Sequence, residues 1–184
     1  MIITMTGKPC SGKSVVIAYM MGKYGFKRFS TGEIFRKIAT DRGIDVLELN
    51  RQHDVSVDKI VDDELIKAGE RDIDKDIIFD SRTAWHFIPK SFKVFLDVQE
   101  DEQARRLLGS GRTNENINLT HEEAKKNLKE RWDLENDRFK EIYNFDNRDN
   151  SNYDLVVDTT GKTIEEVGEL IYSEYEKYLK KVNK

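Results

Sequence analysis

The feature that most constrains this chain is a run of eight residues near its amino terminus that fits the pattern G-x-x-x-x-G-K-[ST]. The run consists of Gly7, Lys8, Pro9, Cys10, Ser11, Gly12, Lys13 and Ser14. An apolar segment at residues 1–5 precedes it and a helical pattern at residues 13–24 follows it. The glycines let successive backbone N–H groups face one anion, and the following helix adds its positive end. The sequence therefore predicts a site for the phosphates of a nucleoside triphosphate.

Two side chains of this loop have predicted roles in binding the triphosphate. Lys13 is expected to reach the β- and γ-phosphates, and the Ser14 hydroxyl is expected to bind Mg²⁺. Cys10, the single cysteine, is expected to supply a backbone N–H group rather than redox chemistry, and it excludes an internal disulfide.

Short apolar segments alternate with helix-length amphipathic segments along the rest of the chain. We expect strands at residues 1–5, 27–30, 76–80, 92–97 and 153–158, and their Ile, Val and Phe content favours burial on both faces. We expect helices at residues 13–24, 31–41, 56–70, 100–108, 121–143 and 163–181. This alternation predicts an α/β fold, a five-stranded parallel sheet with helices on both faces. Together with the phosphate-loop motif, it leads us to expect a P-loop NTPase fold.

Length and composition limit the number of domains and the kinds of partner that we expect. A chain of 184 residues without a Pro/Ser-rich linker indicates a single domain, residues 1–184. With 31 basic and 35 acidic residues the net charge is −4, so we expect neither a nucleic-acid partner nor a membrane partner. Because no membrane-length apolar run or signal peptide is evident, we expect a cytoplasmic protein, and we expect it to be a monomer.

Two other classes of phosphate-loop protein fit the sequence poorly. A regulatory GTPase would need an N-K-x-D element, which the chain lacks, and a D-x-x-G element where Asp80-Ser81-Arg82 stands. A shikimate-type kinase would need a D-x-D pair after the second strand, and residues 27–31 contain no aspartate. Both alternatives are therefore disfavoured.

The segment after the second strand, S-T-G-E-I-F-R at residues 30–36, begins a helix. Ser30 as the N-cap with Glu33 three residues later predicts a capping box. Arg36 falls in the second turn of this helix, where it can close over an anion held near the positive helix end.

These segments together resemble the nucleoside monophosphate kinases, and most of all the short, archaeal-type cytidylate kinases. Residues 30–36 are similar to the S-x-G-[DE]-x-[FY]-R segment of that family, and residues 80–85 (DSRTAW) to its [DE]-G-R-x-x-x-W element. Residues 131–138 are similar to its R-x-x-[SD]-[ED]-x-x-R helix, and residues 153–167 to its last strand, adenine-side loop and C-terminal helix. The resemblance runs from Ile2 to about Leu170.

The resemblance implies an ATP-dependent kinase that phosphorylates CMP or dCMP, with Mg²⁺ as the metal. It implies an acceptor-binding region at about residues 30–72 and a lid at about residues 109–135, where the polar stretch 109–120 suggests a mobile loop. The implied acceptor-binding residues are Ser30, Gly32, Arg36, Arg82, Arg131, Glu135 and Arg138. The implied catalytic residues are Lys13, Arg112, Arg131 and Arg138, and the implied metal ligands are Ser14 and Asp80.

The helix at residues 121–143 places three of these residues on one face, because Arg131, Glu135 and Arg138 are spaced i, i+4 and i+7. Without the phosphate loop this spacing would indicate an exposed ladder of ion pairs. In a kinase the two arginines can bridge the donor and acceptor phosphates, with Glu135 orienting them or meeting the acceptor ribose. No general base is needed, since the acceptor monoester is already largely a dianion at pH 7.

The sequence departs from the family pattern at two positions close to the expected base. Ser81 stands in place of a glycine, and Thr83 stands where larger bacterial cytidylate kinases carry a second aspartate. Adenylate kinases share an S-T-G-D-x-x-R element, so an acceptor other than CMP, such as AMP or UMP, remains an alternative. A nucleotide-binding protein without catalytic activity is the alternative from a different functional class.

Overall fold

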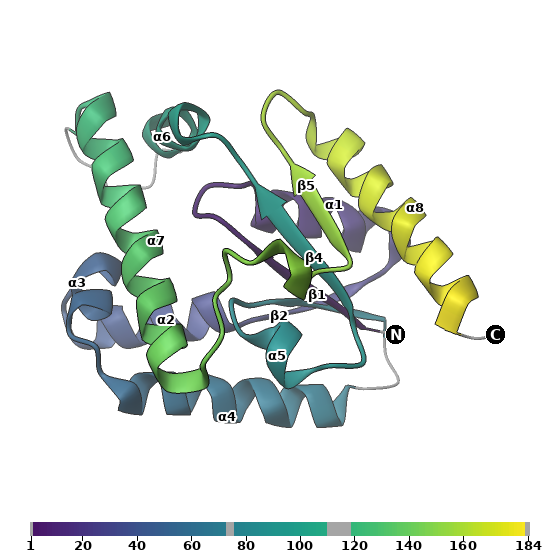
Figure 1. Cartoon of the computed structure of the whole chain (residues 1–184), viewed down its shortest axis with the longest axis horizontal. Coiled ribbons are helices and arrows are strands. Elements are labelled where there is room, and N and C mark those ends of the chain that lie inside the picture. The colour runs from purple at the N-terminus through teal and green to yellow at the C-terminus, as the bar shows by residue number, and fades with distance from the viewer. Residues whose placement is uncertain (1, 73–75, 110–118, 183–184) are drawn as a thin grey trace.

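The structure is a computed structural model that describes residues 2–72, 76–109 and 119–182. Its strands form one sheet in the order β2-β3-β1-β4-β5, and all neighbouring strands are parallel (Figure 1). The strands are β1 (Ile2–Gly7), β2 (Lys27–Ser30), β3 (Ile77–Asp80), β4 (Phe92–Asp97) and β5 (Leu155–Asp158). The predicted five-stranded parallel sheet is therefore confirmed.

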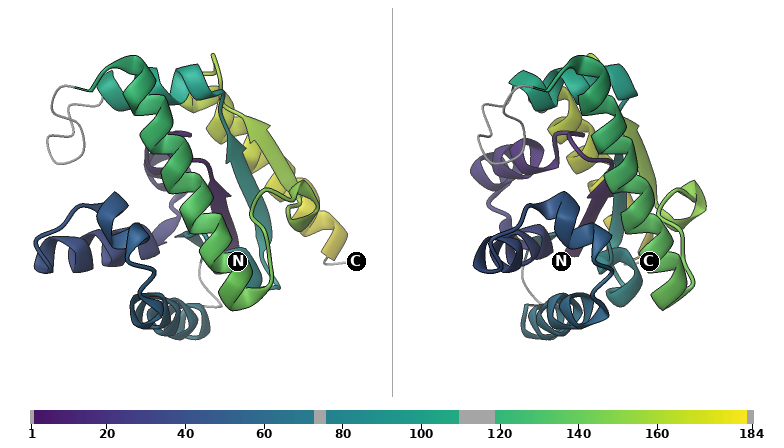
Figure 2. Two further views of the ribbon diagram at one scale, coloured as in Figure 1. Left: turned by 60° about the vertical axis from the view of Figure 1, so that its left-hand side comes forward. Right: turned by 90° about the vertical axis from the view of Figure 1, so that its left-hand side faces the viewer.

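Helices cover both faces of this sheet. On one face lie α1 (Lys13–Tyr24) and α8 (Ile164–Val182); on the other lie α4 (Val55–Arg71), α5 (Ala84–Phe87) and α7 (His121–Tyr143). The remaining helices are α2 (Thr31–Asp41), α3 (Val46–Arg51), α6 (Glu100–Gly109), which packs against α7, and the 3₁₀ turn η1 (Asn150–Asn152). Figures 1 and 2 show α2 and α3 projecting from the sheet on the opposite side of the molecule from α8.

Alternate residues of the central strands bury apolar side chains in two separate cores. Ile3 and Met5 of β1 pack toward α1 and α8, whereas Ile2 packs toward α4 and α5. Phe95 of β4 faces the second layer, where its ring centroid lies 6.1 Å from that of Trp132 on α7. Burial on both sides explains why these strands read as nearly continuous apolar runs in the sequence.

The structure differs from the sequence-based expectations at the sheet edges and in two short helices. The edge strands β2 and β5 are largely accessible, so the expected burial on both faces is wrong for them. The helices α3 and α5 were not predicted, because six-residue and four-residue segments are too short to show helical periodicity. The helix predicted at residues 56–70 spans Val55–Arg71.

The sheet topology brings the carboxyl ends of β1, β3 and β4 to one edge. Met5 pairs with Asp80 across β1 and β3, and Gly7 pairs with Leu96 across β1 and β4. Ligands of open parallel sheets bind at this edge. The phosphate loop after β1 and the Asp80-Ser81-Arg82-Thr83 segment after β3 therefore meet there.

Candidate active site

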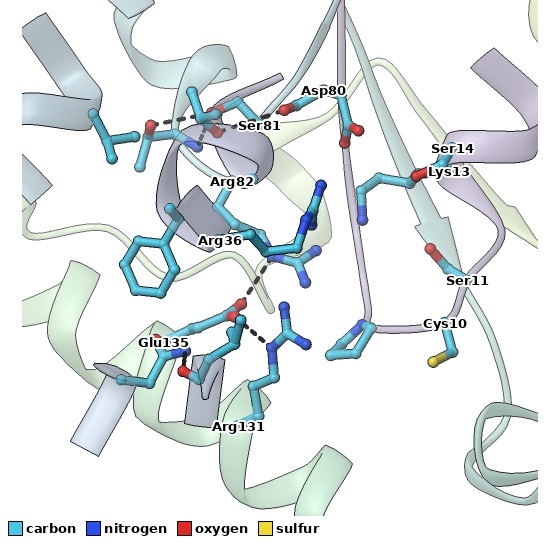
Figure 3. A pocket seen from close by; sticks show the side chains of 18 of the residues that line it. Cys10, Ser11, Lys13, Ser14, Arg36, Asp80, Ser81, Arg82, Arg131 and Glu135 are labelled. Atoms are coloured by element: carbon cyan, nitrogen blue, oxygen red, sulfur yellow. Dashed lines mark hydrogen bonds and ion pairs between the residues drawn. The ribbon is translucent and has the colours of Figure 1, made fainter. Parts of the chain in front are cut away.

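A cavity of about 690 Å³ lies at this edge of the sheet, a size typical of small-molecule sites (Figure 3). Its wall combines the phosphate loop and α1 with side chains from α2, α3, α4, α7 and the segment after β3. Predicted site residues on this wall are Pro9, Cys10, Ser11, Gly12, Lys13, Ser14, Gly32, Arg36, Asp80, Arg82, Arg131, Glu135 and Arg138. Residues from separate segments of the sequence therefore line the same cavity.

The phosphate loop has the backbone geometry that its glycines predict. Gly12, the N-cap of α1, has φ 89°, a left-handed conformation that glycine adopts without strain. A Cβ atom on Gly7 would lie 2.4 Å from the carbonyl oxygen of Leu96, so only glycine fits there. The N–H of Lys8 donates to that same carbonyl oxygen at 3.1 Å and holds the loop against β4.

Lys13 lies on the cavity wall beside Asp80, and the guanidinium groups of Arg36, Arg82 and Arg131 point toward the middle of the cavity (Figure 3). Its Nζ atom lies 3.5 Å from the carbonyl oxygen of Gly7. Burial, together with the positive charges of Arg82 and Arg131, lowers the pKa of Lys13 to about 7. A cavity that depresses a lysine pKa in this way favours an anionic ligand.

Glu135 holds two of these arginines in place. One carboxylate oxygen accepts from Arg82 Nε at 2.9 Å and the other accepts from Arg131 Nε at 3.0 Å. Burial alone would raise the pKa of Glu135, but Arg82 and Arg131 outweigh burial and lower it to about 2. The Arg82 side chain also stacks over Trp132, at 5.2 Å from the ring centroid, and its buried Nη1 atom has no hydrogen-bond partner among the described residues.

Arg138, one turn further along α7, is held by a different set of partners. Its Nε donates to the Asp58 carboxylate at 3.0 Å and its Nη1 donates to Asn50 Oδ1 at 2.8 Å. The guanidinium lies between the rings of Phe35 and Phe139, at 5.6 and 5.2 Å from their centroids. Arg138 therefore belongs to the wall made by α2, α3 and α4, whereas Arg131 faces the phosphate loop.

The start of α2, directly after β2, differs from the sequence-based expectation in its side-chain hydrogen bonds. The capping box of Ser30 and Glu33 is absent, because the Ser30 side chain makes no cap hydrogen bond and Glu33 pairs with Arg28 at 2.6 Å. Ser30 Oγ lies 3.4 Å from Asp80, whose carboxylate also accepts from Arg28 Nη2 at 2.8 Å. No pattern in the sequence indicated this Arg28–Asp80 pair.

A few predicted residues lie off the cavity wall or outside the described part of the chain. Gly7, Lys8 and Ser30 do not line the cavity, and the Lys8 side chain instead pairs with Asp97 at 2.7 Å. Arg112 and residues 110–118 of the expected lid lie outside the described residues. The lid therefore stays a prediction.

Several residues on the wall were not recognised from the sequence, namely Asn50, Asp58, Asp62 and Arg106. The i, i+4 spacing of Asp58 and Asp62 was the available signal, since it puts both carboxylates on one face of α4. Arg106 donates to the backbone oxygens of Cys10 and Thr159, at 3.3 and 2.8 Å, and so covers the phosphate loop from α6.

Comparison with known proteins identifies the family of this chain. A family model described as an AAA domain matches residues 6–123. A cytidylate kinase from Natronomonas pharaonis is 36% identical over 166 residues, which cover 86% of this chain and 81% of the relative. Another, from Methanocella arvoryzae, is 32% identical over 174 residues, 94% of this chain and 95% of the relative. The chain belongs to the cytidylate kinase family.

Solved structures of lower sequence identity agree with the family's fold. A shikimate kinase from Bacteroides thetaiotaomicron superimposes with a TM-score of 0.64 at 15% identity, covering 96% of this chain and 98% of that one. This likeness concerns the fold alone and confirms a sheet and helix arrangement shared among phosphate-loop kinases. None of the helices in the described residues combines the length and apolar character needed to cross a membrane.

Proposed function

We propose that this member of the cytidylate kinase family transfers the γ-phosphoryl group of ATP to CMP or dCMP, giving ADP and the nucleoside diphosphate. The observation that carries the proposal is the convergence of Lys13, Arg36, Arg82 and Arg131 on one cavity (Figure 3). The names of the relatives support the choice of acceptor.

Donor and acceptor would occupy different parts of this cavity. The phosphate loop suits the triphosphate, because its backbone N–H groups and the amino end of α1 attract anions. The region at residues 30–72 suits the monophosphate, since it contributes Arg36, Asn50, Asp58 and Asp62 to the wall. We propose these assignments on position and charge.

Phosphoryl transfer spreads negative charge over the migrating group, so catalysis depends on alignment and on compensating positive charge. In this proposal Arg131 bridges the donor and acceptor phosphates, and Glu135 fixes its orientation together with that of Arg82. The acceptor phosphate has a second pKa of about 6 and is largely a dianion at pH 7. No side chain therefore needs to remove a proton from it.

Ser14 and Asp80 would hold Mg²⁺, which would supply further positive charge to the phosphates. Both lie on the cavity wall, and hydroxyl and carboxylate oxygens are donors that Mg²⁺ prefers. Arg28 pairs with one Asp80 oxygen, Oδ2, and this pair keeps the carboxylate at the end of β3.

A coupled assay of ADP release tests this proposal directly. We expect kcat/KM to be highest for CMP or dCMP when CMP, dCMP, UMP, AMP and GMP are compared under identical Mg-ATP. If AMP outperforms CMP, the choice of base is wrong and the monophosphate kinase activity stands. If no monophosphate is phosphorylated, both parts of the proposal fail.

A further inference from the structure

One side of the cavity carries a set of polar side chains that hydrogen-bond among themselves. We call this set the acceptor-side cluster; it consists of Asn50, Asp58, Asp62, Thr83 and Arg138. Every member lines the cavity and is at most 8% exposed. Buried polar groups facing a cavity imply a ligand with matching hydrogen-bonding groups.

The two carboxylates of the cluster have different partners. Asp58 is paired with Arg138 at 3.0 Å, so its charge is compensated within the protein. Asp62 has no cationic partner among the described residues, and its partners there are the hydroxyl groups of Thr83, at 3.3 Å, and of Tyr143. Each carboxylate oxygen accepts more than one hydrogen bond, so Asp62 can accept another from a ligand.

Aromatic side chains of the cavity favour a ligand that contains a flat ring. Phe35 and Phe139 line the same cavity, and both ring centroids lie within 6 Å of the Arg138 guanidinium. The Nε–H group of Arg138 donates to Asp58, and one N–H group on Nη1 donates to Asn50. An arginine has five N–H donors, so others remain for ring acceptors.

Cytosine and uracil differ at the group that would face a carboxylate. Cytosine carries an exocyclic amine, a donor, whereas uracil carries a carbonyl oxygen at the same ring position. A carboxylate accepts from the amine and repels the carbonyl oxygen. We propose that Asp62 reads the exocyclic amine of the acceptor base and so makes the enzyme prefer cytosine to uracil. This inference rests on the proposed function.

Asp62 would thereby compensate for a departure seen in the sequence. Thr83 stands where larger bacterial cytidylate kinases carry an aspartate, and the Thr83 hydroxyl touches Asp62 Oδ1. The carboxylate comes from α4, 21 positions away in the sequence, and it reaches the same part of the site through helix packing.

The decisive experiment compares Asp62→Asn with Asp63→Asn. Asp63 is the neighbouring residue on α4, and it is exposed, so it is a matched control. We expect Asp62→Asn to reduce the ratio of kcat/KM for CMP over UMP by 10- to 100-fold, since an amide donates to the carbonyl oxygen that a carboxylate repels. Asp63→Asn should leave the ratio unchanged.

A ribose hydroxyl is the other ligand group that can donate to Asp62, and a comparison with dCMP distinguishes it from the base amine. If Asp62→Asn changes the CMP/dCMP ratio and leaves the CMP/UMP ratio within threefold of wild type, the carboxylate binds the ribose and the inference is wrong. Equal phosphorylation of CMP and UMP by the wild-type protein also overturns the inference, while the monophosphate kinase proposal stands.

A second measurement needs no variant and so does not depend on whether Asp62→Asn folds. Burial, with the nearby Asp58 charge, raises the pKa of Asp62 to about 6 despite its hydrogen bond from Tyr143. The charge of Asp63, on the same helix, also raises this pKa, while Arg138 on α7 is paired with Asp58. We expect the wild-type CMP/UMP ratio to fall as pH is lowered from 8 to 5.5, because protonated Asp62 can donate to the uracil oxygen.

The phosphates of CMP and UMP titrate alike, so this ratio cancels their contribution. Asp62→Asn should give a flat profile over the same range. A wild-type ratio that does not change with pH would overturn the inference, since only a titrating group at the base itself should alter it.

Discussion

The two sides of the cavity are built in different ways. The phosphate loop is eight contiguous residues, and we assign its backbone N–H groups and Lys13 to the donor phosphates. The acceptor-side cluster comes from α3, α4, α7 and the segment after β3, and its Arg138–Asn50 hydrogen bond joins residues 88 positions apart. In the proposed function, donor binding therefore depends on local sequence, whereas acceptor binding depends on tertiary packing.

The two sides also differ in how their charges are balanced. Backbone N–H groups need no counter-ion, so the loop can face an anion directly. A buried arginine needs a carboxylate to stay in place, and here Glu135 holds Arg82 and Arg131 while Asp58 holds Arg138. Base selection requires such positioned side chains, and we therefore look for specificity on the acceptor side.

The largest effect that we expect is on the donor side, from Lys13→Met. Removing this charge should lower kcat by at least 1,000-fold and leave the fold intact, because the side chain acts on charge that develops during transfer. Lys23→Met, on the same helix but exposed and paired with Glu169, is the control and should retain wild-type activity. A folded Lys13→Met protein with more than a tenth of wild-type activity would contradict the assignment.

The next largest effect is expected from Glu135→Gln, which should lower both the activity and the stability of the protein. Glu135→Gln removes the carboxylate that holds Arg82 and Arg131, so kcat/KM for the acceptor should fall by about 10- to 100-fold. Removing the buried negative charge that these two partly buried cations share should lower the free energy of unfolding by about 3 kcal/mol. Urea unfolding and the coupled assay measure the two losses.

The pH dependence of this stability loss has a definite sign. The pKa of Glu135 in the folded protein, about 2, is below its ordinary value of 4.5. The carboxylate therefore stabilises the fold above pH 4.5, and this contribution disappears as pH falls toward 2. The difference in unfolding free energy between wild type and Glu135→Gln should shrink from pH 7 to pH 3.

A neighbouring glutamate on α7 provides the control for Glu135. Glu130 pairs with Arg51 at 2.9 Å, but both side chains are about one-third exposed or more. Glu130→Gln should change stability by less than about 1 kcal/mol, since such pairs are screened by water and salt. If Glu130→Gln lowers the free energy of unfolding as much as Glu135→Gln does, the contacts of Glu135 with Arg82 and Arg131 contribute no more to stability than an exposed ion pair.

The contrast between the two sides also explains how far sequence reasoning reached. The strands and long helices were predictable because their apolar spacing is a local property, and the phosphate loop was predictable because its motif is contiguous. The Arg28–Asp80 pair and the Asp58–Arg138 pair were not, because each joins residues more than 50 positions apart. Such pairs are visible only after the helices have packed.

The predicted role of Glu135 shows the same limit within a single helix. Its spacing with Arg131 placed both residues on one face of α7, and the structure has them hydrogen-bonded at 3.0 Å. The sequence did not reveal that Arg82, 53 positions earlier, would bind the second oxygen. The carboxylate thus orients arginines of two segments, which periodicity alone cannot predict.

The smallest effect that we expect is the uptake of about one proton when Mg-ATP binds, and it tests the donor side again. Burial and the charges of Arg82 and Arg131 hold the pKa of Lys13 at about 7, so at pH 8 most of the unliganded protein has a neutral amine there. Bound phosphates favour the charged form and should raise this pKa toward its ordinary value of 10.5. Binding of Mg-ATP at pH 8 should therefore take up close to one proton, whereas binding at pH 6 should take up little, because Lys13 is already charged. Calorimetry in buffers of different ionisation enthalpy measures this uptake, and Lys13→Met reports the background from the nucleotide itself. Equal uptake by wild type and Lys13→Met at pH 8 would mean that the donor phosphates are bound by the loop backbone without a change in the charge of Lys13.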